Sequence, residues 1–269
     1  VGSEMCIRDS FSSVQEMEEY RKAKEEMSLG ELGAIYESER AGVSLDQVRS
    51  QMESLIKTME NSIALGLKGT HYDDRILHSQ SPKFGEKMSA GQLVPGDVLN
   101  RIILYVSSMM EMKSSMGVIV AAPTAGSCGA LPGAVLGVSD AMEKSMDQRI
   151  DAMFAAGIVG VFIASGATFA AEEAGCMAEC GSGASMGAAG IVSLGGGTYK
   201  QQMAAASMAL QSSLGMTCDT LANRVEAPCL GRNVTAASNA LSSANMALAD
   251  YDDLVPLNQV IDAMRQVGD

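Results

Sequence analysis

The chain has 269 residues, of which 47% are hydrophobic and only 4% aromatic, and its formal net charge is −13. This length and apolar content exclude an intrinsically disordered chain and allow a large buried core. The negative charge argues against nucleic acid or an anionic membrane surface as a partner, so we expect neither.

Small and flexible side chains dominate the apolar content, with 28 Gly, 20 Met and no Trp. Small residues let helix backbones approach one another closely, and Met fills irregular gaps between them. Patterns typical of strands are sparse along the chain. We therefore predict an all-α fold: a single compact helical domain with a buried central helix.

Residues 1–10, VGSEMCIRDS, follow neither the helical nor the strand period. We interpret them as an artefact or a disordered leader and exclude Cys6 from any chemistry. Six cysteines in a chain of this length do not form a disulfide-stapled miniprotein, and we recognise no secretory signal. Reduced thiols and a cytoplasmic location are the expectation.

Two capping patterns predict helices in the first third of the chain. Ser13 followed by Glu16 opens a charged helix to about Met27, and Ser44 followed by Gln47 opens a helix with one apolar face. We expect both helices to cover the core from outside.

The weakly patterned stretch 66–96 predicts a long loop with short helical turns, followed by a helix that Asp97 caps. The stretch holds both histidines, His71 and His78. A histidine in a polar loop is usually solvated, and a catalytic role for either one is the alternative.

A short β-branched run, 117–122, leads into the turn 123–129, PTAGSCG, and Pro132 suits the first turn of a helix. Such a turn ahead of a helix can present N–H groups and hydroxyls to an anion. An ordinary tight turn is the alternative. A Walker loop is excluded, because the GK[ST] ending is absent.

Residues 152–171 carry no charge and are long enough to span a bilayer. Glycine, serine and threonine dilute this run, acidic residues lie at both ends, and no Lys/Arg cluster sets an orientation. We therefore predict a buried central helix that ends near Glu172. The glycine-rich run 181–197 predicts close-packed helix and turn rather than a linker, and further helices are expected in 199–215, 233–248 and 256–267.

Four cysteines fall in two glycine- or charge-rich segments: Cys176 and Cys180, then Cys218 and Cys229. The spacing matches neither CxxC nor the cysteine runs of ferredoxins. Buried inert thiols, a structural zinc site and an iron–sulfur site all remain open on spacing alone. A cysteine nucleophile is disfavoured, since it would need a nearby histidine.

Three blocks carry a family resemblance: APTAGSCGALPGAVLG (122–137), EEAGCMAECGSGASMGAAG (172–190) and CDTLANRVEAPCLGRNVTAASNA (218–240). They resemble the iron–sulfur-dependent L-serine dehydratase (L-serine ammonia-lyase) family, specifically its alpha subunit or catalytic domain. The resemblance itself runs from about Leu45 to the end. We assign the whole of residues 11–269 to that domain. It implies an all-helical fold whose glycine-rich loops bind a [4Fe–4S] cluster.

Matched motif by motif, the three cluster ligands of that family fall on Cys176, Cys218 and Cys229. Cys128 and Cys180 lie within the motifs but do not match the ligands. Three thiolates leave one iron with an open position, which marks a catalytic metal centre. That iron would polarise the hydroxyl of L-serine, an unidentified base would remove the Cα proton, and pyridoxal phosphate would not be needed.

For the substrate carboxylate we expect partners in the turn 123–129, namely Thr124, Gly126 and Ser127, and the side chain of Arg224. Helix-end or ion-pair roles for Arg224 and Arg232 are the alternative. The family usually pairs this domain with a beta portion and continues beyond Asp269. We therefore expect a separate beta subunit, a homo- or hetero-oligomer and a truncated C-terminus.

Two rival hypotheses follow from the same residues. One is a related lyase that acts on L-cysteine, a desulfidase. The other is a non-catalytic protein that uses its thiols, or zinc bound to them, structurally.

Overall fold

The computed structural model of the chain describes residues 11, 13–23 and 27–268. In this part of the chain the regular structure is helical, and the single β-type pairing is an isolated bridge between Leu221 and Arg224. The expected all-α fold is confirmed. The expected leader, 1–10, and Cys6 lie outside the described residues. The helices are α1 (Val14–Ala23), α2 (Leu29–Ala41), α3 (Leu45–Gly66), α4 (Ser81–Ser89), α5 (Asp97–Ser114), α6 (Ala130–Ala141), α7 (Met146–Gly166), α8 (Ala171–Cys176), the π-helical turn η1 (Met177–Gly181), α9 (Ser182–Leu194), α10 (Tyr199–Gln211), α11 (Glu226–Leu248) and α12 (Leu257–Gly268).

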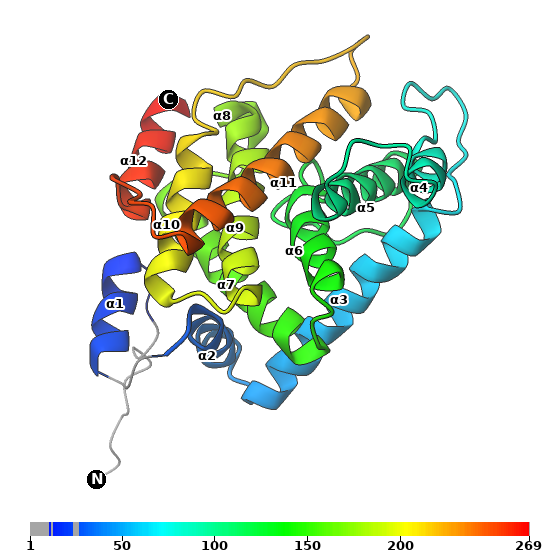
Figure 1. Ribbon diagram of the computed structural model, residues 1–269. Helices are drawn as coiled ribbons and strands as arrows, with labels where there is room; N and C mark the ends of the chain where they lie inside the picture. The colour runs from blue at the N-terminus through cyan, green and yellow to red at the C-terminus, as the bar shows by residue number, and fades with distance from the viewer. Residues whose placement is uncertain (1–10, 12, 24–26, 269) are drawn as a thin grey trace.

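Helix α9 lies at the centre of the molecule, enclosed by α6, α7, α10 and α11 (Figure 1). Every residue of α9 except Ser193 is buried. Its glycines allow this enclosure: a Cβ on Gly190 would lie 2.8 Å from the side chain of Val135 and 3.1 Å from the Ala152 carbonyl oxygen. The glycine-rich run is therefore packed helix, as predicted.

Helix α7 is the buried apolar helix predicted from residues 152–171, but it is the neighbour of the central helix and it ends at Gly166. The prediction that it continues to Glu172 is wrong. Ala167 is extended, with φ −146° and ψ −145°, and the Thr168 hydroxyl accepts a hydrogen bond from the Ala170 N–H at 3.0 Å. This local hydrogen bond replaces the helical one and lets the chain turn toward α8.

Length and composition alone would allow α7 to cross a membrane, and 61% of its most apolar window is buried inside the protein. It packs between α2 and α9. A helix that is apolar on all sides and surrounded by other helices has the properties of a core helix.

The capping box predicted for the second helix is confirmed at the start of α3. The Ser44 side chain accepts from the Gln47 N–H, and the Gln47 side chain accepts from the Ser44 N–H. At the start of α1 the Ser13 hydroxyl accepts from the Glu16 N–H at 3.2 Å.

Helix α1 is described over Val14–Ala23, and residues 24–26 of its expected extension to about Met27 lie outside the described residues. Met27 is not helical, and α2 starts from a capping box of its own. The described residues contain three further capping boxes that were not predicted from the sequence. They pair Ser28 with Glu31, Ser145 with Gln148, and Thr198 with Gln201.

Other boundaries also differ from expectation. Asp97 is the first residue of α5, and Gly96 is the residue that caps the helix. Helix α11 begins at Glu226 rather than Asn233, because Pro228 falls in its first turn, where no helical N–H is needed.

Candidate active site

Cys176 ends α8, and Cys180 lies in the π-helical turn η1 that follows. Turns of this kind often mark functional sites. Just before them Gly175 has φ 66° and ψ −166°, a conformation that interrupts the helix and that glycine adopts readily. Both thiols are buried. The conformation of this segment thus sets the direction of the two thiols.

The chain that leads to Cys218 packs directly against this turn. The Met177 N–H donates to the Met216 carbonyl oxygen at 3.0 Å, and the Gly215 N–H lies 3.3 Å from the Met177 sulfur. These backbone contacts bring the exposed Cys218 beside the buried Cys176.

Cys229 reaches the same place from α11. A tight turn joins the two segments, closed by paired hydrogen bonds between Leu221 and Arg224, with positive φ at Ala222 and Asn223. Helix α11 starts two residues later, and Cys229 is buried in its first turn.

Hydrogen bonding and burial shift the pKa values of the four thiols in different directions. A hydrogen bond with Cys180 is the main cause that lowers the pKa of Cys176; burial opposes it, and Cys218 adds a second hydrogen bond. The same pairing, together with burial, raises the pKa of Cys180. Burial is the main cause that raises the pKa of Cys218, and of Cys229 to about 11. Cys176 is therefore the thiol that ionises most readily.

In the described part of the chain, no three His, Cys, Asp or Glu side chains are arranged to hold a single metal ion. A structural zinc site needs four ligands that converge on one point. Each cysteine of a [4Fe–4S] cluster binds a different iron, so its ligands need not converge in this way. The thiols of Cys176, Cys218 and Cys229 come from three segments that pack against one another, and thiolates are the ligands that an iron–sulfur cluster uses.

The turn 123–129 faces the cysteine segment, and Glu179 connects the two. The Thr124 hydroxyl donates to a Glu179 carboxylate oxygen at 2.6 Å and accepts from the Ser127 N–H at 3.2 Å. A Cβ on Gly126 would lie 2.5 Å from both carboxylate oxygens of Glu179. Glu179 therefore covers the loop that was predicted to hold the substrate carboxylate.

The start of α6 is occupied by an internal partner. The side-chain oxygen of Asn233 accepts from the N–H groups of Gly129 at 3.1 Å and Ala130 at 2.9 Å. They follow Thr124, Gly126 and Ser127, the residues of the turn 123–129 that were predicted to bind the substrate carboxylate. The structure assigns these two N–H groups to α11.

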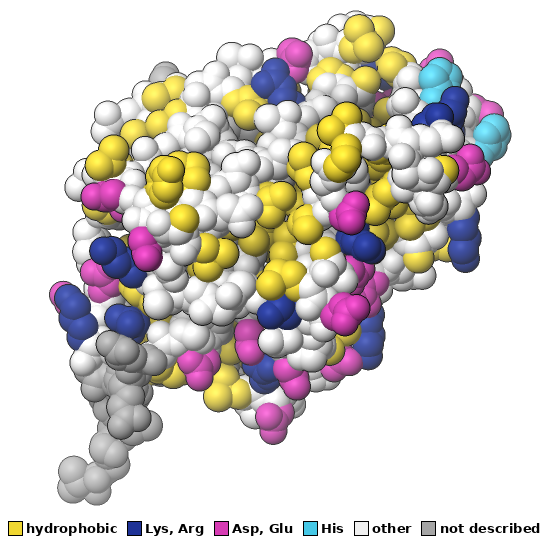
Figure 2. Space-filling view, viewed as in Figure 1, with side chains coloured by type: hydrophobic (Ala, Val, Ile, Leu, Met, Phe, Trp, Pro, Cys, Tyr) yellow, Lys and Arg dark blue, Asp and Glu magenta, His cyan; other side chains and the backbone are white. Residues whose placement is uncertain are grey.

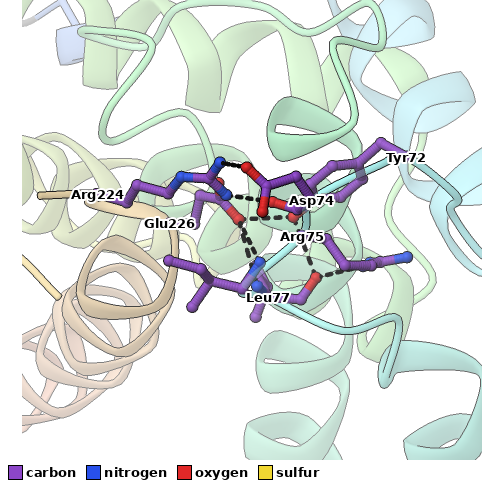
Figure 3. Close-up of polar contacts among 7 residues, drawn as sticks. Tyr72, Asp74, Arg75, Leu77, Arg224 and Glu226 are labelled. Atoms are coloured by element: carbon purple, nitrogen blue, oxygen red, sulfur yellow. Dashed lines mark hydrogen bonds and ion pairs between the residues drawn. The ribbon is translucent and has the colours of Figure 1, made fainter. Parts of the chain in front are cut away.

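Arg224 belongs to a network between the start of α11 and the loop 70–79 (Figure 3). Its guanidinium pairs with Asp74 at 2.5 Å and with Glu226 at 3.4 Å. Glu226 in turn accepts from the Tyr72 hydroxyl at 2.7 Å and from the Leu77 N–H at 3.2 Å. Arg224 therefore has the ion-pair role that the sequence left open as the alternative, and a contact with substrate stays a prediction.

Two further cations act on the thiols. Burial raises the pKa of Cys128 to about 12 and also raises the pKa of Cys229. The positive charge of Lys113 opposes both increases without cancelling them. Arg232 pairs with Asp219 at 3.2 Å, next to Cys218. Lys113, at the end of α5, was not predicted from the sequence as a site residue, and its positive charge acts on the pKa of both Cys128 and Cys229.

Both histidines lie exposed at one edge of the molecule (Figure 2). This matches the solvated role expected for a histidine in a polar loop. The loop around them is held by Arg75, which donates to the carbonyl oxygens of Thr70 and Leu77 at 2.6 and 2.7 Å.

Glu179, Asn233 and Glu226 are the site residues that sequence reasoning missed. Glu179 could have been noticed as the acid between two cysteines in CMAEC, and Asn233 as an asparagine one turn after Cys229. Their partners are distant in sequence, so no local pattern shows them.

Comparison with known proteins adds the family context. A family model described as "Serine dehydratase alpha chain" matches residues 11–269. The chain is 33% identical over 258 residues to the "Probable L-serine dehydratase, alpha chain" of Bacillus subtilis, covering 96% of this chain and 86% of that protein. It is 34% identical over 224 residues to the L-serine dehydratase alpha chain of Peptoniphilus asaccharolyticus, covering 83% and 77%. With L-serine dehydratase TdcG of Escherichia coli it shares 36% identity over 177 residues, 65% of this chain and 39% of that protein.

Proposed function

The chain belongs to the serine dehydratase alpha-chain family, and we propose that it converts L-serine to pyruvate and ammonia. The observation that carries the proposal is that the three sequence blocks resembling this family are in direct contact in the structure. Glu179 of the second block binds Thr124 of the first, and Asn233 of the third binds Gly129 of the first. The reaction removes water from L-serine and returns it when the resulting imine hydrolyses, so no oxidant or reductant is consumed.

We propose that Cys176, Cys218 and Cys229 hold a [4Fe–4S] cluster. Thiolates are the ligands that iron–sulfur clusters require, and these three come from separate segments that pack against one another. When bound, the cluster supplies an iron with an open coordination position, which polarises the serine hydroxyl as a Lewis acid. The proposal leaves Cys128 and Cys180 as buried thiols and gives no role to pyridoxal phosphate.

Thr124, Gly126 and Ser127 are proposed to bind the substrate carboxylate, with Arg224 as a charged partner. The Thr124 hydroxyl already donates to a carboxylate in the structure, that of Glu179. A substrate carboxylate can accept the same kind of hydrogen bond. Arg224 would have to leave Asp74 to take part, whereas the positive charge of Lys113 already acts on the pKa of Cys229.

We also propose a second, beta-type subunit. Two of the relatives above are named alpha chains, and this chain matches only 39% of the length of the Escherichia coli relative. The active assembly is then an oligomer of alpha- and beta-type parts.

Anaerobic co-expression with a beta-type subunit of the family tests the proposal. The purified assembly should contain iron and sulfide, absorb broadly in the visible range and form pyruvate from L-serine faster than from L-cysteine. Colourless protein with zinc and no turnover would contradict it and favour a structural role for the thiols. Faster turnover of L-cysteine would instead identify a desulfidase.

A further inference from the structure

Asn233 is a buried side chain whose hydrogen-bonding groups are all used. Its side chain can form four hydrogen bonds, two as acceptor and two as donor. The oxygen accepts from the Gly129 and Ala130 N–H groups, as described above. The nitrogen donates to the carbonyl oxygens of Gly126 and Cys229, both at 2.8 Å.

These four hydrogen bonds join two parts of the proposed site. On one side lies the backbone 126–130, which continues the turn that carries Thr124 and Ser127. On the other side lies the first turn of α11, where Cys229 precedes Asn233 by one helical turn. The Asn233 nitrogen also lies 3.7 Å from the Cys180 sulfur. A single side chain therefore contacts the loop, the turn that holds Cys180 and the start of α11 that holds Cys229.

We propose that Asn233 is a positioning residue that fixes the substrate loop relative to the Cys229 thiol. The inference rests on the proposed function and deepens it. In a lyase that binds the substrate carboxylate on the loop and the hydroxyl on a metal, the distance between these two places decides whether the substrate is aligned. A misplacement of about 1 Å can lower turnover about a hundredfold.

The chemistry of the amide explains why asparagine is needed. Asn233→Asp keeps an acceptor for Gly129 and Ala130 but replaces the donor by a carboxylate oxygen. That oxygen would face the carbonyl oxygens of Gly126 and Cys229, which repel it. The loop and the α11 turn would then move apart, although no proposed ligand has been removed.

Asn239 provides a matched control on the same helix. Its nitrogen donates to the Ala209 carbonyl oxygen at 2.8 Å, and its oxygen accepts from the Ser243 hydroxyl at 3.2 Å, so it joins α11 to α10. Asn239→Asp therefore breaks the same kind of hydrogen bond in the same helix, away from the loop.

The experiment compares both variants in the reconstituted alpha–beta assembly under anaerobic conditions. We expect Asn233→Asp to lower kcat for L-serine about 10- to 100-fold, with a smaller change in KM, and to speed iron release to a chelator by a similar factor. Asn239→Asp should stay within about twofold of wild type in both measurements, although both variants can lower the unfolding temperature.

Equal kcat and equal iron release in the two variants would overturn the positioning role of Asn233. If Asn233→Asp does not fold, Asn233→Ser and Asn239→Ser are compared in the same way, because serine keeps one donor and one acceptor. Failure of the proposed function is seen separately: wild type would then hold no iron and form no pyruvate.

Discussion

Gly175 and Met216 lie in backbone contact: a Cβ built on Gly175 would lie 2.7 Å from the Met216 carbonyl oxygen. The chain before Cys176 therefore passes against the chain before Cys218 with no room for a side chain. This contact, with the hydrogen bond from Met177 to Met216, sets the separation of two of the three proposed cluster ligands.

Gly175→Ala should therefore separate the two segments. The conformation with φ 66° and ψ −166° disfavours alanine by about 1–3 kcal/mol, and the clash adds to this cost. We expect loss of bound iron with retained helical circular dichroism. Gly196→Ala is the control, since Gly196 also has positive φ, 73°, but open space around it. Iron content that stays equal in the two variants would show that this contact does not set the site.

The network around Glu226 predicts a pH dependence of stability. Burial acts to raise the pKa of Glu226, but hydrogen bonds from Tyr72, Leu77 and Ile76 and the charge of Arg224 outweigh it and lower the pKa. A carboxyl whose folded pKa is depressed stabilises the fold above its unfolded pKa, and this contribution is lost as pH falls through the folded pKa.

Glu226→Gln should thus be less stable than wild type near neutral pH, and the difference should shrink on acidification below the ordinary pKa of glutamate. Chemical unfolding measured from neutral to acidic pH checks this. A stability difference that is independent of pH would contradict the role given to the Glu226 charge.

Lys113 is predicted to attract the substrate carboxylate. Lys113→Met should raise KM for L-serine about tenfold with a smaller change in kcat, the size expected for loss of one charge-assisted contact. Lys57→Met is the control, because Lys57 pairs with Glu53 on the exposed face of α3. Steady-state kinetics on both variants distinguish a local effect from a change in overall charge.

The capping boxes show what the sequence could predict. Ser44 and Gln47 define the start of α3 correctly because a cap and its helix are neighbours in sequence. The end of α7 at Gly166 could not be predicted in this way. Ile261 of α12 packs against this end, and its side chain would lie 2.7 Å from a Cβ on Gly166, a contact between distant residues that no local pattern shows.

The same distinction between local patterns and long-range contacts applies to the candidate site. The three proposed ligands and the loop 123–129 came from blocks that resemble a family. Glu179 and Asn233 act through partners 55 and 104 residues away, so only the packed structure shows them. Arg224 was chosen as a candidate because of its charge. Its pairing with Asp74 could not be predicted, because the two residues are 150 positions apart in the sequence.

Oxygen should inactivate the enzyme. A cluster with an open iron position is exposed to oxidants, so activity should fall in air and return after anaerobic treatment with iron, sulfide and a reductant. Paired assays of pyruvate formation before and after aeration check this. Activity that survives prolonged aeration, or that depends on added pyridoxal phosphate, would refute the cluster mechanism.

The most direct test of the central claim compares Cys176→Ala with Cys180→Ala. Both residues are buried, and they are four positions apart in the same segment. Cys180→Ala should lower stability by about 1–2 kcal/mol, as a small core truncation does, and keep the visible absorbance.

The measurement is iron and sulfide per chain, together with pyruvate formed from L-serine, after anaerobic purification. The account predicts that Cys176→Ala loses the cluster and the activity, whereas Cys180→Ala retains both. A colourless, inactive Cys180→Ala protein beside a brown, active Cys176→Ala protein would contradict the assignment of the ligands.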